Sequence, residues 1–313
     1  MLNRKIDNEI DVHFSNSKKA LFLTGARQVG KTYSIRKYAK LHGLNLIEFN
    51  FLLQPEAMDI INGAGDVKEL LLRISAYSRV PLVRSKTLIF FDEVQECPDV
   101  MTWVKALVDE GSYIYALSGS LLGVELKDIR SVPVGYMSEM QVYPMDFEEF
   151  VSAVGVPENV LDAVKKSWSE KTLVDAYIHE RMLQLFQLYI IVGGMPAAVQ
   201  TYIDSNNIQN VVKEQRDIIN LYKKDIARYD KDVRKKLYID EVFDLIPSEL
   251  NAKNKRFILK RLNENMTFGR HENDFIWLKD ADMALPTYNV EEPVSPLKLS
   301  EQRNLFKLFQ NDV

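Results

Sequence analysis

The segment at positions 25–32, which reads GARQVGKT, restricts the fold of this chain more than any other stretch. It matches the pattern G-x-x-x-x-G-K-[ST] at every fixed position, follows the apolar run ALFLT and precedes a segment of helical character. Glycines let backbone N–H groups wrap around an anion, and the N-terminus of the following helix attracts negative charge. The segment predicts a phosphate-binding loop between a strand and a helix. The alternative is a glycine turn that matches the pattern by chance.

Two side chains of this loop have predicted chemical roles. The ammonium group of Lys31 is expected to neutralise the outer phosphates, which makes it a candidate catalytic residue as well as a binding residue. The hydroxyl group of Thr32 is expected to bind Mg²⁺. The candidate nucleotide-binding residues of the loop are Gly25, Ala26, Arg27, Gln28, Val29, Gly30, Lys31 and Thr32.

A second motif, LIFFDE at positions 88–93, lies about sixty residues further along. Its four apolar residues predict a buried strand, and Asp92 at the end of that strand is a candidate Mg²⁺ ligand. Glu93 is a candidate general base that would activate water for attack on the γ-phosphate. The alternative is a strand that merely ends in polar residues. The Asp-Glu pair favours hydrolysis over phosphotransfer to a small molecule, and nothing in the sequence indicates the acceptor pocket of a kinase.

The segment YALSGS ends a further apolar run and places Ser118 and Ser120 beyond it. Either hydroxyl group would be able to contact the γ-phosphate or the attacking water, so both are candidate nucleotide-binding residues. A simple Ser-Gly turn is the alternative.

The first half of the chain alternates strand-like and helix-like segments, which predicts a parallel sheet covered by helices on both faces, as in P-loop NTPases. From residue 173 onward helical spacing dominates, and the segments FIWLKD and ALPTYNV predict a pair of strands. We therefore expect an α/β ATPase domain over 1–153 and a mainly helical domain with a winged-helix-like unit over 172–313. The predicted strands are 20–24, 44–50, 86–93, 112–120 and 138–145, and the predicted helices of the first half are 31–42, 66–79 and 98–111.

Composition excludes several classes of protein. The only cysteine among the 313 residues is Cys97, so an internal disulfide is impossible, and the four scattered histidines predict no zinc site. The charged N-terminal segment does not resemble a secretory signal, and no apolar run reaches the roughly 20 residues of a membrane span. These features predict a cytoplasmic protein without a membrane partner. With a net charge of −4, any affinity for nucleic acid would have to come from a local patch.

Taken together, the motifs resemble those of a family of prokaryotic AAA-type ATPases. The phosphate loop, the Asp-Glu strand, the SGS strand end and YPMDFEEF at 143–150 carry the resemblance in the first half. IVGGMP, YKKDIARYD, IPSELNAKNKRF and WLKDADM follow in the expected order in the second half. The family has a C-terminal domain of unknown function with a winged-helix part and then a nuclease-like part. The resemblance implies that the protein binds ATP with Mg²⁺ and hydrolyses it.

Two departures from the family pattern affect the expected activity. The family has a basic residue after a glycine shortly before YPMDFEEF, where it is a candidate for sensing phosphate charge, but Tyr136 follows Gly135 here. A tyrosine cannot supply that cation, so we expect a slow ATPase unless Arg130 substitutes. The segment LFKLFQNDV resembles the point where family members enter the nuclease-like part. We therefore expect either a fragment or the loss of that part, and no nuclease activity is predicted.

The span 223–261 is rich in lysine and arginine and predicts a helix-turn-helix with a basic second helix. Such a unit would bind DNA largely through phosphate contacts. The alternatives are helix faces that are simply solvated, or a docking site for a protein partner or for a second copy. The basic residues are Lys223, Lys224, Arg228, Lys231, Arg234, Lys235, Lys236, Lys253, Lys255, Arg256, Lys260 and Arg261.

The sequence thus predicts an ATP-binding protein that hydrolyses ATP and couples the nucleotide state to its second domain. ATP is favoured over GTP by the family resemblance, and no N-K-x-D guanine-binding signal is present. The rival hypothesis is a nucleotide-dependent switch or DNA-binding regulator with little turnover, which Tyr136 favours. The substitution Glu93→Gln separates the two hypotheses, because an ATPase would lose turnover and keep nucleotide binding.

Overall fold

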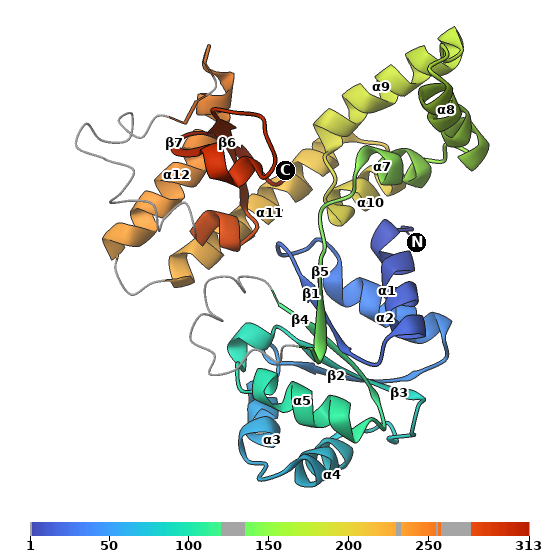
Figure 1. The fold of residues 1–313 in the computed structure, drawn as a ribbon, viewed down its shortest axis with the longest axis vertical. Helices are drawn as coiled ribbons and strands as arrows, with labels where there is room; N and C mark the ends of the chain where they lie inside the picture. The colour runs from blue at the N-terminus through green and yellow to red at the C-terminus, as the bar shows by residue number, and fades with distance from the viewer. Residues whose placement is uncertain (1, 120–134, 230–232, 255, 258–276, 313) are drawn as a thin grey trace. The chain divides into compact units, whose positions relative to one another are not determined.

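The computed structural model describes residues 2–119, 135–229, 233–254, 256–257 and 277–312 (Figure 1). The chain divides into two compact units, Met1–Gln187 and Leu188–Val313. This division lies within helix α9 (Ala176–Val192), C-terminal to the connection that the sequence places between residues 153 and 172. Phe147 of α7 (Phe147–Ala153) packs edge-on against Phe186 of α9, with ring centroids 5.2 Å apart, and this contact joins the two helices within the first unit.

A five-stranded parallel sheet forms the centre of the N-terminal unit, in the order β2-β3-β4-β1-β5. Its β1 and β3 strands are buried along their whole length, which explains why they read as continuous apolar runs in the sequence. The predicted parallel sheet is confirmed. Its strands are β1 (Ala20–Thr24), β2 (Asn45–Asn50), β3 (Thr87–Asp92), β4 (Ile114–Ser118) and β5 (Met137–Gln141).

Helices cover both faces of this sheet, as predicted (Figure 1). Helices α1 (Lys5–Asn16) and α2 (Lys31–Leu41) lie on one face, and α3 (Met58–Asn62), α4 (Val67–Tyr77) and α5 (Val100–Glu110) lie on the other. The connection from β1 to β2 leads to the edge of the sheet that β2 forms. The connections from β2 to β3 and from β3 to β4 lead in the opposite direction across the sheet. Right-handed crossovers therefore place α2 and the helices α3–α5 on opposite faces.

Local sequence explains where several helices begin and end. Asp66 accepts a hydrogen bond from the N–H of Glu69 at 2.8 Å and so caps the N-terminus of α4. Gly111 ends α5 with φ +71°, a conformation in which glycine is favoured. The sequence did not predict α1, because its charged residues hide the two buried apolar positions Ile6 and Ile10.

The core of the N-terminal unit lies between the sheet and helices α4 and α5. Phe22, Phe49 and Phe91 from three strands of the sheet belong to this layer, together with Leu70 of α4 and Val104 of α5. Successive residues of a strand point to opposite faces, so the alternate residues of the same strands cover the other face of the sheet. Helices thus pack against the sheet that carries the loops at its carboxyl edge.

The C-terminal unit contains helices and an antiparallel strand pair, β6 (Ala284–Val290) with β7 (Glu301–Gln310). Its helices after α9 are α10 (Pro196–Ser205), α11 (Ile208–Tyr229) and α12 (Val233–Asn251), whereas α8 (Glu158–Glu170) belongs to the first unit. The prediction of a strand at ALPTYNV is confirmed as β6. The prediction of a strand at FIWLKD is wrong for its described part, since residues 277–280 are helical. The predicted basic helix at 255–264 lies almost entirely outside the described residues.

The segment GGMP separates α9 from α10. Gly193 has φ +75°, and the N–H of Gly194 donates a 2.6 Å hydrogen bond to the carboxylate of Asp312. A Cβ atom at Gly193 would lie 2.3 Å from the same carboxylate, which would have to move, and the positive φ itself favours glycine at this turn. Among the helices that the structure describes, none alone has the length and apolar composition to cross a membrane. The bent pair α9 and α10 meets that test when the two are taken together.

Candidate nucleotide-binding site

The predicted phosphate loop connects β1 to α2 at the carboxyl edge of the sheet. Its backbone has positive φ at Gly25 (+136°), Gln28 (+65°) and Gly30 (+100°). A Cβ atom on Gly25 would lie 2.2 Å from the carbonyl oxygen of Val142, in the segment that follows β5. Only glycine therefore lets the loop pass this close to the neighbouring backbone.

Lys31 is the first residue of α2 and is only 7% exposed. Its Nζ donates hydrogen bonds to the carbonyl oxygens of Gly25 and Ala26, at 2.7 and 2.8 Å. The ammonium group is therefore folded back over the loop that precedes it. Gly30, which precedes the helix, has no side chain to cap the N-terminus of α2, and such an end attracts anions.

Asp92 lies at the end of β3 and receives hydrogen bonds from three other elements. The hydroxyl group of Thr32 in α2 donates to its Oδ2 at 3.0 Å, and the side-chain amide of Asn50 in β2 donates to the same oxygen at 2.9 Å. The hydroxyl group of Ser118 in β4 donates to Oδ1. Three of the predicted site residues, from α2, β3 and β4, thus meet at one carboxylate, which is 2% exposed.

Burial raises the pKa of Asp92 above its ordinary value, and the neighbouring charges of Glu93 and Glu48 raise it further. The hydrogen bonds from Ser118 and Thr32 act in the opposite direction. A divalent cation beside this carboxylate would relieve the cost of keeping its charge buried. The Asp92 carboxylate and the Thr32 hydroxyl are hard oxygen donors of the kind that Mg²⁺ prefers, so the residues fit this ion.

Glu93 follows Asp92 with φ +58°, a strained backbone conformation for a residue with a side chain. Its Oε2 accepts a hydrogen bond from Nε2 of Gln95 at 2.5 Å, and Gln95 is 6% exposed. The strain sits at the residue that the sequence indicates as the general base. A buried amide fixes one oxygen of the carboxylate there.

Sequence reasoning missed Asn50 and Gln95. Asn50 is paired in register with Asp92 across β2 and β3. The available signal for Asn50 was its position as a polar residue at the end of a predicted strand. Gln95 follows Glu93 by two residues in a short 3₁₀ turn, and its type alone carries no signal. Ser118 is fully buried and contacts Asp92, so its hydroxyl group is committed to the carboxylate in this structure. Ser120 and Arg130 lie outside the described residues.

The structure corrects the interpretation of Tyr136. Its carbonyl oxygen accepts a hydrogen bond from the N–H of Ala20, the first residue of β1, and β5 begins at Met137. In a parallel sheet this is the edge opposite the phosphate loop, about 16 Å away for a strand of this length. Nζ of Lys105 lies 5.4 Å from the centroid of the Tyr136 ring. A basic residue here would not reach the phosphates along this sheet, so Tyr136 gives no reason to expect slow turnover.

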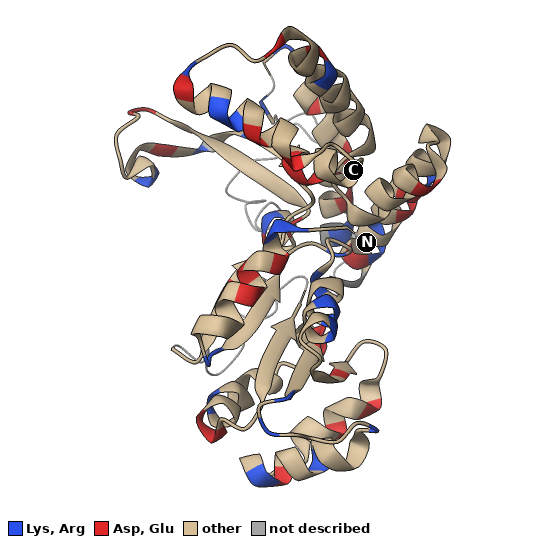
Figure 2. Cartoon of the chain, turned by 90° about the vertical axis from the view of Figure 1, so that its right-hand side faces the viewer, with Lys and Arg blue, Asp and Glu red and all other residues tan. Residues whose placement is uncertain are grey.

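The basic cluster predicted over 223–261 is only partly described. Nζ of Lys223 forms an ion pair with Asp244 at 2.6 Å, and the Asp240 carboxylate lies 3.8 Å from the same nitrogen. Both signs of charge occur along the helices (Figure 2), and α12 carries Asp240, Glu241 and Asp244 in one stretch. At least one lysine of the cluster is therefore neutralised within the unit. The side chains of Arg228, Lys231, Arg234, Lys235, Lys255, Lys260 and Arg261 lie outside the description.

Two family models match this chain. Residues 17–151 match a family described as an AAA domain, and the match covers the sheet, the phosphate loop and Asp92. Together with the parallel sheet, this match supports a P-loop NTPase fold of the AAA type for this part of the chain. Residues 183–313 match a domain of unknown function, DUF8612. No curated protein matches the chain.

Several solved structures are similar to the chain. The Walker-type ATPase PABY2304 of Pyrococcus abyssi is 14% identical, with a TM-score of 0.56, and the match covers 99% of this chain and 94% of that one. The Orc1 protein of Aeropyrum pernix in complex with DNA is 14% identical over 100% of this chain and 90% of its own, with a TM-score of 0.35. Cdc6p of Pyrobaculum aerophilum is 13% identical over 91% and 87%, with a TM-score of 0.36. At these identities the first similarity supports the fold alone.

Proposed function

We propose that this protein binds ATP with Mg²⁺ at the loop 25–32 and hydrolyses it. The observation that carries the proposal is the meeting of Thr32, Ser118 and Asn50 at the buried carboxylate of Asp92, beside a loop that matches the phosphate-binding pattern at every fixed position. A carboxylate kept at 2% exposure is costly unless a cation or strong donors compensate for its charge.

Each proposed role follows from position. Backbone N–H groups of the loop would bind the phosphates, and the Lys31 ammonium would exchange its carbonyl partners for phosphate oxygens. Thr32 and Asp92 would hold Mg²⁺, which neutralises phosphate charge when it is bound. Glu93 would accept a proton from the attacking water, and Gln95 would hold its carboxylate in place. Ser118, through its hydrogen bond to Asp92, would respond to the nucleotide state.

The second half of the chain is proposed to transmit the nucleotide state to a partner. We retain the domain limits 1–153 and 172–313, with a winged-helix-like unit in the latter, as a proposal. Helices α10–α12 followed by the β6–β7 hairpin are compatible with such a unit. DNA is the proposed partner of the basic span 223–261, with a protein partner as the alternative, and the Lys223–Asp244 ion pair reduces the positive charge that this span offers to DNA.

A steady-state phosphate-release assay tests the proposed reaction. Wild-type protein should release phosphate in the presence of MgATP, and Glu93→Gln should abolish release while it retains nucleotide binding. The assay is repeated with duplex DNA, since stimulation would support coupling to DNA. MgATP binding without release under either condition would refute hydrolysis.

The alternative is a nucleotide-dependent switch with little turnover. The 2.5 Å hydrogen bond between Gln95 and Glu93 favours it, because the carboxylate oxygen that accepts this bond must release the amide before it can accept a proton from water. The substitution Gln95→Met separates the hypotheses. Faster turnover in this variant would support a restrained switch, and slower turnover would support Gln95 as a residue that orients the base.

A further inference from the structure

Arg4 connects three separate segments of the N-terminal unit. Its Nη1 donates to the carbonyl oxygen of Val29 at 2.9 Å, and its Nη2 donates to the carbonyl oxygen of Tyr143 at 2.7 Å. Its Nε donates to Glu149 at 3.0 Å. The residue is 8% exposed, so these charge-assisted hydrogen bonds are shielded from water.

The three acceptors belong to the phosphate loop and to the segment YPMDFEEF. Val29 lies within the loop, directly before Gly30. Tyr143 and Glu149 lie in the segment that follows β5, and the adjacent carbonyl oxygen of Val142 is the one that approaches Gly25. Glu149 also forms a capping box with Asp146 at the start of α7, which fixes its carboxylate. Arg4 thus fastens the loop to a rigid helix start.

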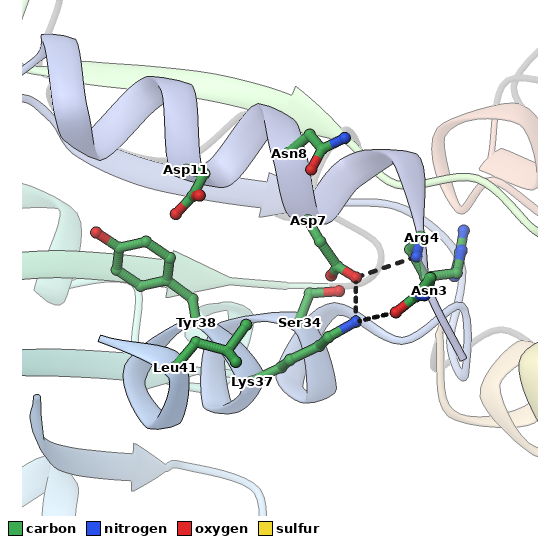
Figure 3. Close-up of a pocket in the computed structure, with 9 residues that line it drawn as sticks. All are labelled: Asn3, Arg4, Asp7, Asn8, Asp11, Ser34, Lys37, Tyr38 and Leu41. Atoms are coloured by element: carbon green, nitrogen blue, oxygen red, sulfur yellow. Dashed lines mark hydrogen bonds and ion pairs between the residues drawn. The ribbon is translucent and has the colours of Figure 1, made fainter. Parts of the chain in front are cut away.

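The position of Arg4 is fixed independently of these contacts. Its backbone N–H donates to the Asp7 carboxylate at 3.0 Å, and Nζ of Lys37 in α2 donates to the same oxygen at 2.7 Å. Figure 3 shows these contacts at the cavity between α1 and α2, which has a volume of about 380 Å³, with the guanidinium group of Arg4 turned away from Lys37. The first turn of α1 is therefore attached to the helix that carries the phosphate loop.

We propose that Arg4 is a positioning residue that holds the phosphate loop in its binding conformation before nucleotide arrives. The carbonyl group of Val29 and the N–H group of Gly30 belong to one trans peptide unit and point in opposite directions. A guanidinium group that holds the carbonyl toward Arg4 directs the N–H of Gly30 to the other side of the loop, toward the predicted phosphate position. The inference rests on the proposed nucleotide site, and it assigns a role to the YPMDFEEF segment.

Hydrogen exchange measured without nucleotide tests the clamp itself. Amides of residues 25–32 should exchange at least about tenfold faster in Arg4→Gln than in wild type, and by less in Arg4→Lys, which keeps the charge but cannot reach three acceptors. Lys37→Met is the matched control, because Lys37 is as buried as Arg4 and pairs with Asp7 without contacting the loop. It should lower the thermal midpoint and raise exchange in the loop by less than about twofold, because the three guanidinium hydrogen bonds of Arg4 remain.

Calorimetric titration with MgATP then tests the consequence. Affinity should fall about tenfold in Arg4→Gln, with partial rescue in Arg4→Lys, and should change less than about twofold in Lys37→Met. A tenfold loss corresponds to about 1.4 kcal/mol, close to the lower end of the range for one hydrogen bond to a charged group. Unchanged loop exchange in both Arg4 variants would overturn the inference. So would an equal effect of Lys37→Met, which would indicate general loosening of α1. If wild type bound no MgATP, the proposed function would fail, whereas the exchange comparison would still decide whether the clamp exists.

Discussion

The substitution Gly25→Ala tests the geometry of the phosphate loop most sharply. Gly25 has φ +136°, and a new Cβ atom would lie 2.2 Å from the carbonyl oxygen of Val142, where an ordinary contact begins at 3.4 Å. Strain from the backbone conformation costs about 1–3 kcal/mol, and relief of the clash costs a similar amount. We therefore expect Gly25→Ala to destabilise the N-terminal unit by about 4 kcal/mol.

Gly43→Ala is the matched control for this prediction. Gly43 also has a positive φ, +60°, but nothing lies within 4 Å of its added Cβ atom, so only the backbone term of about 1 kcal/mol applies. Hydrogen exchange of peptides from β1 and β3 reports the free energy of opening of this unit separately from the other. A difference of about 3 kcal/mol between the variants would change the opening equilibrium more than a hundredfold. Equal effects of the two substitutions would refute the close approach of the loop to Val142.

Three further predictions follow from buried polar groups. Asp92→Asn should raise the thermal midpoint at pH 7, because burial raises the pKa of Asp92 and the ionised carboxylate is unfavourable in the fold. This gain should shrink as the pH falls through the pKa of Asp92 in the folded protein, because the wild-type carboxyl group is then protonated too. A gain that grows at low pH would contradict the assignment. Burial raises the pKa of the Cys97 thiol to about 11, so iodoacetamide at pH 8 should modify it only after unfolding, as mass spectrometry would detect. Gln95→Met should change kcat in the phosphate-release assay, because Gln95 donates a 2.5 Å hydrogen bond to the proposed base Glu93, and an unchanged kcat would show that this hydrogen bond does not influence the base.

The sequence predicted the parallel sheet and the site at its carboxyl edge because both have strong local signals. The apolar runs of β1 and β3 are buried along their whole length, and the loop and the Asp-Glu pair follow them directly. Features that depend on pairing across the sheet were not predictable. Asn50 meets Asp92 only through the register of β2 and β3. Tyr136 was misplaced because the sequence does not show that β5 pairs in parallel with β1, with Met137 opposite Ala20.

The contacts of Arg4 show the same limit at longer range. Its acceptors Tyr143 and Glu149 are 139 and 145 residues away along the chain, so no local pattern indicates that they meet. The strand prediction for the FIWLKD segment was wrong for a different reason. Short apolar runs are ambiguous between strand and buried helix, and here Trp277 and Leu278 are buried in a helical segment.

Calorimetric titration of the whole chain with ATP, in the presence and absence of Mg²⁺, tests the central claim most directly. The account predicts binding that is tighter with Mg²⁺ and that is lost in Lys31→Ala, because this substitution removes the only ammonium group that the structure places against the carbonyl groups of the described loop. Circular dichroism of the variant should remain that of wild type. Absence of Mg²⁺-dependent ATP binding by the wild-type protein, or equal affinity in folded Lys31→Ala, would contradict the account.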